Sequence, residues 1–139
     1  MNVLESFSLK GKVALVTGGA GLYGRQIVEA LAEAGAETYI ASRNLESLQQ
    51  VAKEEVERGY NVTAMQLDLS QDESIEKLYS DIITKSGKCD ILINNAVSRE
   101  FGSAGWKNTL DDFDKSLRIN ASALFKITQM FAEDMKKNN

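Results

Sequence analysis

The stretch VALVTGGAGLYG, from Val13 to Gly24, decides the fold of this 139-residue chain. Its first five residues are apolar or β-branched, which predicts a buried parallel strand over 13–17. Glycine then fills four of the next seven positions, and a pattern of helical period runs from about Leu22 to Ala34. A strand, a glycine-rich turn and a helix in this order are typical of a βαβ unit, in which a helix joins two parallel strands.

The rest of the chain repeats this alternation of short strands and longer helices. Three further runs are short and rich in apolar, β-forming residues, and they predict strands over 37–41, 61–67 and 90–93. Segments with helical period separate these runs. The alternation therefore predicts an α/β fold with a parallel sheet.

Polar residues and glycines mark the ends of the predicted helices. Asn44 is placed to cap the helix that Gly59 ends. Ser70 and Glu73 predict a capping box for the next helix, which closes near Gly87.

The last third of the chain predicts a long loop and a long helix. Residues 94–108 show no period, and a capping box of Thr109 with Asp112 begins a helix that reaches about Lys137. Spacing at about 100° per residue predicts one buried stripe. Its members are Leu110, Phe113, Leu117, Ala121, Leu124, Thr128, Phe131 and Met135.

The composition predicts one folded domain, residues 1–139, because hydrophobic residues make up 43% and charged residues 26% of the chain. The net charge of −4, with scattered basic residues, speaks against a nucleic-acid partner, and no apolar run approaches the roughly 18 residues of a membrane span. Metal ligands are scarce, because the chain has no histidine and a single cysteine, Cys89. We expect no metal site, and a soluble protein of the cytoplasm.

The glycine segment is a candidate phosphate site. Gly19, Gly21 and Gly24 fit the pattern G-x-G-x-x-G, and Gly18, Gly21 and Gly24 fit G-x-x-G-x-x-G. Glycines between a strand and a helix let a pyrophosphate approach the free amides of the helix start. A tight turn that needs positive φ is the structural alternative, but one or two glycines suffice for it. The expected cofactor contacts are Gly18, Gly21, Leu22, Tyr23 and Gly24.

The end of the second predicted strand indicates which dinucleotide binds. It reads Ala41-Ser42-Arg43, with no acidic residue to accept hydrogen bonds from the ribose hydroxyls. Arg43 and the Ser42 hydroxyl suit a 2′-phosphate instead, which favours NADP(H) and leaves NAD(H) as the alternative. Without a cofactor, Arg43 is a solvated surface residue beside a helix cap.

Four stretches carry a resemblance to the short-chain dehydrogenase/reductase family over nearly the whole chain. They are LKGKVALVTGGAGLYG (9–24), LDLS (67–70), DILINNAV (90–97) and RINASALF (118–125), and they occur in the family's order. The resemblance implies a Rossmann-type, doubly wound parallel sheet of about four strands in the order 3-2-1-4, with three α/β/α layers. It also implies bound NAD or NADP and hydride transfer between the nicotinamide and a carbonyl or alcohol carbon.

The resemblance assigns further residues to the cofactor. Asp68 would accept a hydrogen bond from the adenine amino group, with the Leu69 backbone beside it, and Asn95 and Ala96 would line a ribose. Each has a plainer alternative, because Asp68 also suits a strand end and asparagines often satisfy loop backbone.

Asn120 is the one catalytic residue that we predict in the chain. It falls inside the apolar stripe of the long helix, where a side-chain amide needs partners. One interpretation is a core asparagine bonded to the carbonyl one turn back, which bends the helix. The resemblance implies instead that Asn120 lies at a helix distortion and holds a water of the proton relay. Both interpretations predict a distorted helix.

The sequence departs from the family at three places. In the classical form the glycine stretch reads T-G-x-x-x-G-x-G, and Leu22 takes the place of its middle glycine, so we expect Gly18, Gly21 and Gly24 to face the cofactor. Val97 takes the place of the glycine in N-N-A-G. The family's catalytic serine and Y-x-x-x-K pair follow the long helix and lie beyond Asn139, so the fold is expected to be incomplete and the fourth strand's edge bare.

These features predict the cofactor-binding half of an NAD(P)-dependent oxidoreductase that acts on a small alcohol or carbonyl compound. A non-catalytic dinucleotide-binding or assembly module is the first alternative, and a structural fragment that binds nothing is the second. The apolar residues of the long helix that the stripe leaves out, which are Ile119, Phe125 and Met130, predict a homo-oligomer formed through this helix.

Overall fold

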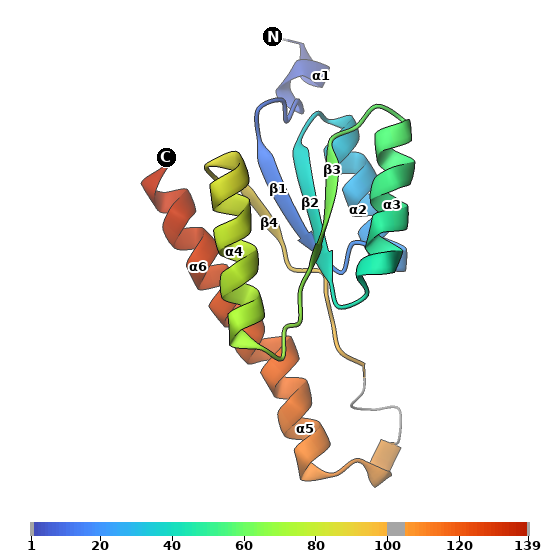
Figure 1. Cartoon of the computed structure of the whole chain (residues 1–139), viewed down its shortest axis with the longest axis vertical. Coiled ribbons are helices and arrows are strands. Elements are labelled where there is room, and N and C mark those ends of the chain that lie inside the picture. Colours follow the sequence, from blue (N-terminus) through green and yellow to red (C-terminus); the bar gives the residue numbers. More distant parts are fainter. Residues whose placement is uncertain (1, 100–104, 139) are drawn as a thin grey trace.

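A sheet of four parallel strands lies between two layers of helices in a computed structural model, which describes residues 2–99 and 105–138 (Figure 1). The strands, in the spatial order β3-β2-β1-β4, are β1 (Val13–Thr17), β2 (Glu37–Ser42), β3 (Val62–Gln66) and β4 (Ile91–Ile93). The helices are α1 (Val3–Ser6), α2 (Leu22–Glu33), α3 (Leu45–Glu57), α4 (Asp72–Ser86), the 3₁₀ turn η1 (Gly105–Lys107), α5 (Leu110–Leu117), the π-helix η2 (Arg118–Ser122) and α6 (Ala123–Lys137). The predicted fold class and strand order are confirmed.

Both faces of the sheet are covered, as the continuous apolar character of β1 requires. Successive side chains of a strand point to opposite faces, so Leu15 and Val16 enter different cores. Leu15 packs in a cluster with residues of α4 and α6, and Val16 packs with residues of α2 and α3. Figure 1 shows these two helix pairs on opposite sides of the sheet.

The register brings the carboxyl ends of the strands to one edge. Thr17, the last residue of β1, pairs with Ala41 of β2, and Val16 pairs with Ile93 of β4. Ser42 pairs with Gln66 at the end of β3. The loops that follow all four strands therefore meet at this edge, where parallel α/β sheets bind ligands.

The predicted helix starts are confirmed at two places and wrong at a third. The Asn44 side chain accepts from the Ser47 N–H, and the box of Thr109 with Asp112 is formed. The expected box of Ser70 with Glu73 does not form, because the Ser70 hydroxyl donates to Asp68 instead. Helix α4 therefore begins one residue later than predicted, with Gln71 and not Ser70 as its N-cap.

The long helix is distorted, as predicted, but of its buried residues only Phe131 belongs to the predicted stripe. Its buried residues are Ala123, Ile127, Phe131 and Asp134. Leu110, Phe113 and Leu117 of the expected stripe remain 74%, 42% and 46% exposed. The π-helix η2 adds residues to one turn, so a projection at a constant 100° per residue loses the phase between α5 and α6.

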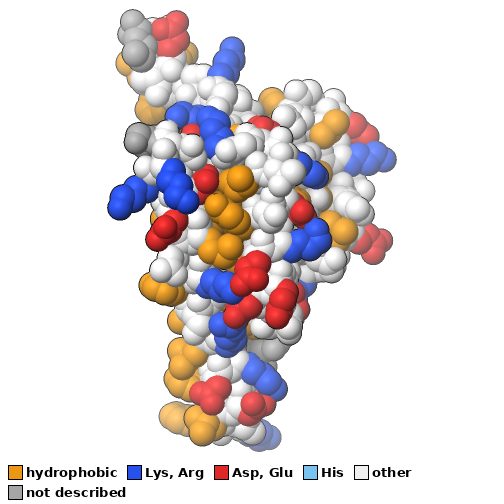
Figure 2. All heavy atoms as spheres, turned by 60° about the vertical axis from the view of Figure 1, so that its left-hand side comes forward, with side chains coloured by type: hydrophobic (Ala, Val, Ile, Leu, Met, Phe, Trp, Pro, Cys, Tyr) orange, Lys and Arg blue, Asp and Glu red, His pale blue; other side chains and the backbone are white. Residues whose placement is uncertain are grey.

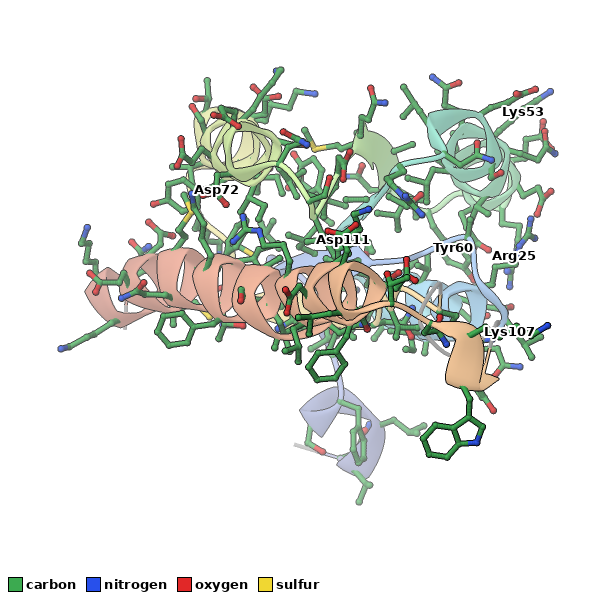
Figure 3. All side chains as sticks on the ribbon, turned by 90° about the horizontal axis from the view of Figure 1, so that it is seen from below. Arg25, Lys53, Tyr60, Asp72, Lys107 and Asp111 are labelled. Atoms are coloured by element: carbon green, nitrogen blue, oxygen red, sulfur yellow. The ribbon has the colours of Figure 1, made fainter. Side chains whose placement is uncertain are left out.

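Charged side chains join α4 to the long helix. Asp72, at the start of α4, accepts from the Arg118 guanidinium and lies 3.4 Å from the Lys126 ammonium. Figure 3 labels Asp72 between α4 and the long helix. The Arg118 hydrogen bond is the main reason why the pKa of Asp72 is lowered. At one edge of the sheet, β4 is half-buried and, among the described residues, pairs with β1 alone, as expected of a bare edge.

Candidate dinucleotide-binding site

A cavity of about 870 Å³ opens at the carboxyl edge of the sheet. Its volume falls within the range of small-molecule sites, about 300–1,000 Å³. All the residues that the sequence predicts for the cofactor line it, and these are Gly18, Gly21, Leu22, Tyr23, Gly24, Ser42, Arg43, Asp68, Leu69, Asn95 and Ala96. The structure therefore brings the predicted contacts together, whereas what each of them binds stays a prediction.

The start of α2 offers backbone donors to the cavity. Gly18 has a φ of +71°, which turns the chain from β1 towards α2, and its carbonyl accepts from the Gly21 N–H at 3.1 Å. Gly21 is the N-cap, and no side chain caps the helix. The first amides of α2 and the positive end of its dipole are therefore available to an anion, as a pyrophosphate requires.

Glycine is required for a different physical reason at each position of this turn. Among the described residues, a Cβ on Gly21 would have only the Gly18 carbonyl oxygen within 4 Å, at 3.4 Å, and Gly21 lines the cavity. A Cβ on Gly19 would lie 2.8 Å from the Ile40 Cβ, in the core. Gly24 lines the cavity but is buried, and a Cβ there would overlap the Gly18 carbonyl oxygen. Close packing of the helix on the turn thus requires Gly24, whereas Gly21 leaves room for a ligand.

Arg43 and Asp68, which carry opposite charges, follow the carboxyl ends of β2 and β3. The Asp68 carboxylate accepts from the Ser70 hydroxyl at 2.7 Å and from the Ser70 N–H at 2.9 Å. These two hydrogen bonds, with a smaller contribution from the Arg43 charge, lower the pKa of Asp68. Asp68 is therefore a fixed, ionised acceptor, and Arg43 is the cation at this end of the cavity.

Thr17 positions the loop after β4, and sequence reasoning missed it. Its buried hydroxyl accepts from the Asn95 N–H at 3.1 Å and from the Ala96 N–H at 3.0 Å. The same hydroxyl donates to the Ile93 carbonyl at 3.4 Å. In the sequence, Thr17 looks like an ordinary β-branched strand residue. The signal that could have found it is its position directly before the glycine turn, where β1 ends beside the end of a neighbouring strand.

The glycine turn and the β4 loop also hold each other directly. The Asn95 side chain donates to the Gly18 carbonyl at 3.1 Å. A Cβ on Gly18 would lie 3.0 Å from the Ala96 Cα, so this glycine allows the two loops to approach closely. The wall of the cavity is therefore built as one unit from the ends of β1 and β4.

Asn120 lies behind this wall and acts on it through Ser98. Its side-chain oxygen accepts from the Ser98 N–H at 2.8 Å, and its nitrogen donates to the Ser98 carbonyl at 2.9 Å and to the Ser116 hydroxyl at 3.1 Å. The alternative interpretation, in which Asn120 bonds to the carbonyl one turn back, is wrong, because its side-chain nitrogen donates to the Ser98 carbonyl and to the Ser116 hydroxyl. The expected helix distortion is present, since Asn120 is the central residue of η2.

The site is equipped to bind and orient rather than to hold a metal. Backbone amides and a guanidinium suit phosphates, and a carboxylate suits an adenine amino group or a hydroxyl. Within residues 2–99 and 105–138, no three Cys, Asp or Glu side chains are placed together to hold a metal ion. The backbone amides, the guanidinium and the carboxylate of this site fit a dinucleotide.

No helix within the described residues has the length and apolar character to cross a membrane.

Comparisons with known proteins agree with this geometry. A family model described as short chain dehydrogenase matches residues 12–139. The short chain dehydrogenase/reductase dpchG of Colletotrichum higginsianum is 34% identical over 132 residues, which cover 94% of this chain and 49% of that protein. The chain spans about half the length of the curated relatives that it matches.

Solved structures show the same fold. A metagenomic short-chain oxidoreductase in complex with NADP has a TM-score of 0.85 and 30% identity, over 91% of this chain and 57% of that one. A 7α-hydroxysteroid dehydrogenase in complex with NADH and 7-oxo glycochenodeoxycholic acid has a TM-score of 0.88 and 28% identity, over 99% of this chain and 53% of that one. Fold, motif order and family match agree, and the chain belongs to the short-chain dehydrogenase/reductase family.

Proposed function

We propose that this chain is the cofactor-binding half of an NADP(H)-preferring oxidoreductase of the cytoplasm. The reaction is hydride transfer between the nicotinamide and the carbonyl or hydroxyl carbon of a small molecule. The relatives support this proposal, because they are named dehydrogenases and reductases and two solved neighbours are complexes with NADP and with NADH.

One observation carries the proposal: a single cavity joins the uncapped start of α2 to Arg43 at the end of β2. A pyrophosphate on the α2 amides leaves the adenosine half of the cofactor over β2 and β3. We expect Arg43 and the Ser42 hydroxyl, which line the cavity there, to contact a 2′-phosphate, and the Asp68 carboxylate and Leu69 backbone to contact the adenine. NAD(H) lacks the 2′-phosphate and gains nothing from Arg43.

The bound dinucleotide supplies the hydride chemistry, and this chain's residues hold and orient it. Asn95 and Ala96 line the ribose on the β4 side, fixed by the Thr17 hydroxyl. Asn120 keeps the following segment in place through Ser98 and is the residue of this chain that we assign to the proton relay.

Calorimetric titration with NADPH and NADH tests the preference. We expect NADPH to bind about tenfold more tightly than NADH, because a charge-assisted hydrogen bond to the phosphate contributes about 1.5 kcal/mol or more. Arg43→Gln should bring the two affinities within about threefold. Arg25→Gln is the matched control, because Arg25 pairs with Glu54 outside the cavity. Equal affinities in the unchanged chain would contradict the preference, and no heat with either cofactor would contradict the site.

We do not expect turnover from these 139 residues alone. A proton donor of this family is a tyrosine with a lysine four positions later, and none of the chain's four tyrosines, Tyr23, Tyr39, Tyr60 and Tyr79, has one. Cofactor binding without turnover is the result that this proposal predicts, and it is also what a non-catalytic binding module would show. Measurable NADPH-dependent reduction by the purified chain would contradict the proposal that these residues supply only the cofactor-binding half of the enzyme.

Exposed apolar side chains on the long helix support a second proposal, that this helix pairs with a second copy of the chain. Leu110 and Phe113 of α5 and Phe125 of α6 are 74%, 42% and 70% exposed. Hydrophobic side chains gather along the lower end of the molecule in Figure 2, where Figure 1 places α5. An apolar helix face of this kind is typical of an interface.

A further inference from the structure

Val97 is held between two anchored residues at the β4 end of the cavity. The preceding residue, Ala96, donates its N–H to the Thr17 hydroxyl at 3.0 Å. The following residue, Ser98, exchanges two backbone hydrogen bonds with the Asn120 amide, at 2.8 and 2.9 Å. The backbone on both sides of Val97 is therefore fixed, and so is the direction in which its β-branched side chain leaves the chain.

The Val97 side chain is available to a ligand. It lines the cavity and is 58% exposed, whereas Ala96 and Ser98 on either side are half-buried. A fixed, exposed isopropyl group in a cavity wall offers apolar contact to whatever lies beside it.

The β4 end of the cavity also carries a positive charge beside the apolar Val97 side chain. Arg99 also lines the cavity, two residues after Val97. Among the described lining residues, the one carboxylate belongs to Asp68, which follows β3, the opposite edge strand of the sheet. Three strand spacings, about 14 Å, separate β3 from β4. The described wall around Val97 therefore has apolar and cationic groups and no anion.

We propose that Val97 is a specificity-determining residue that makes the site prefer the reduced cofactor. The inference rests on the proposed function, because adenosine over β2 and β3 leaves the nicotinamide nucleoside for the β4 end. The reduced nicotinamide is neutral and gains from contact with an isopropyl group. The oxidised ring carries a positive charge that loses hydration there, and none of the described lining residues near Val97 supplies an anion to replace it. Val97 thus strengthens the binding of NADPH more than that of NADP⁺.

Calorimetry of Val97→Ala with three ligands tests this inference. NADPH, NADP⁺ and 2′-phospho-ADP-ribose share the adenosine and pyrophosphate, and the third lacks the nicotinamide. We expect the Kd of NADPH to rise about fivefold, that of NADP⁺ by no more than about twofold, and that of 2′-phospho-ADP-ribose not at all. Val56→Ala is the matched control, because Val56 is 54% exposed on α3 and does not line the cavity.

The outcomes of this experiment distinguish a failure of this inference from a failure of the proposed function. If all three ligands bind the unchanged chain but Val97→Ala changes their Kd values equally or not at all, the inference is overturned and the cofactor site stands. If none of the three binds the unchanged chain, both are overturned. Thermal unfolding midpoints of Val97→Ala and Val56→Ala are expected to agree, since both valines are exposed, and a drop confined to Val97→Ala would identify a structural role and overturn the inference.

Discussion

The side-chain amide of Asn120 pairs with both backbone polar groups of Ser98, accepting from its N–H at 2.8 Å and donating to its carbonyl at 2.9 Å. This pairing reproduces the contact that a neighbouring strand would make. It ties the π-helix η2 to the segment after β4, which forms one end of the cavity. Asn120 therefore acts on the site by holding its wall.

Asn120→Ala is expected to loosen this wall. The loss of the pairing leaves the Ser98 backbone without its partner and should lower the free energy of unfolding by about 1–3 kcal/mol. Hydrogen exchange of the Ser98 amide should become much faster. Ser116→Ala is the control, because it removes one acceptor of the Asn120 nitrogen and leaves the Ser98 pairing intact. An unchanged Ser98 exchange rate in Asn120→Ala would contradict the role assigned to this amide.

The glycine turn allows a separation of binding from folding. Gly21 has φ −73° and ψ 171°, which suit alanine, so Gly21→Ala should leave the unfolding midpoint unchanged. Its Cβ would stand before the α2 amides, and we expect about a tenfold loss of NADPH affinity.

Gly19→Ala is the contrasting variant. Its Cβ would crowd Ile40 at 2.8 Å, which should destabilise the fold by about 1–3 kcal/mol through overpacking. Calorimetry with NADPH and thermal unfolding of both variants distinguish a loss of cofactor affinity from a loss of stability. A stable Gly21→Ala variant that keeps full NADPH affinity would mean that the pyrophosphate does not lie at this turn.

Asp90 predicts an acid-sensitive contribution to stability. Burial raises its pKa, but the Val13 N–H at 2.8 Å and the charges of Lys88 and Lys12 outweigh burial, so the pKa is lowered in the folded state. A lowered pKa stabilises the fold at pH values above the unfolded pKa of about 3.9, and the effect is lost as pH falls through the folded value.

Urea unfolding at several pH values checks this. Asp90→Asn should be less stable by about 1 kcal/mol at neutral pH, with a difference that holds down to about pH 5 and shrinks below about pH 4. Asp114→Asn, the same change at an exposed position of α5, should leave stability unchanged. A difference for Asp90→Asn that persists unchanged in acid would rule out the carboxylate's charge as its cause.

Two phenylalanines of α6 separate the core from the proposed interface. Phe131 is fully buried, with its ring 5.2 Å from that of Tyr79, so Phe131→Ala should cost about 3–5 kcal/mol of stability. Phe125 is 70% exposed, so Phe125→Ala should leave the unfolding of the monomer unchanged and weaken self-association. Analytical ultracentrifugation measures the latter. Sedimentation as a monomer by the unchanged chain at high concentration would contradict pairing through this helix.

Local signals were enough to predict much of the fold and the cavity. Glycine marks the turn after β1, and the period of the apolar residues separates strands from helices, so the parallel sheet followed from the sequence pattern. The resemblance to the family then gave the strand order. Because parallel strands end at one edge, residues that follow them, such as Arg43, Asp68 and Asn95, meet there.

Contacts across long sequence separations could not be predicted in the same way. The position of Thr17 next to the glycine turn hints that it lies at the strand end, but its partners, the Asn95 and Ala96 amides, are known only once β4 lies beside β1. The buried face of the long helix was missed because η2 shifts the phase of α6 relative to α5. The capping box predicted at Ser70 does not form, because Asp68, two residues earlier, takes the same hydroxyl.

Backbone amide shifts in NMR spectra of the ¹⁵N-labelled chain, titrated with NADPH, test the central claim most directly. If the pyrophosphate lies on the start of α2 and the nicotinamide nucleoside beside the β4 loop, the largest shifts fall on the amides of 22–24 and 95–97. Arg43 and Asp68 should follow, at the adenosine end. No shift at millimolar NADPH, or shifts confined to residues outside the cavity, would contradict a dinucleotide site in this chain.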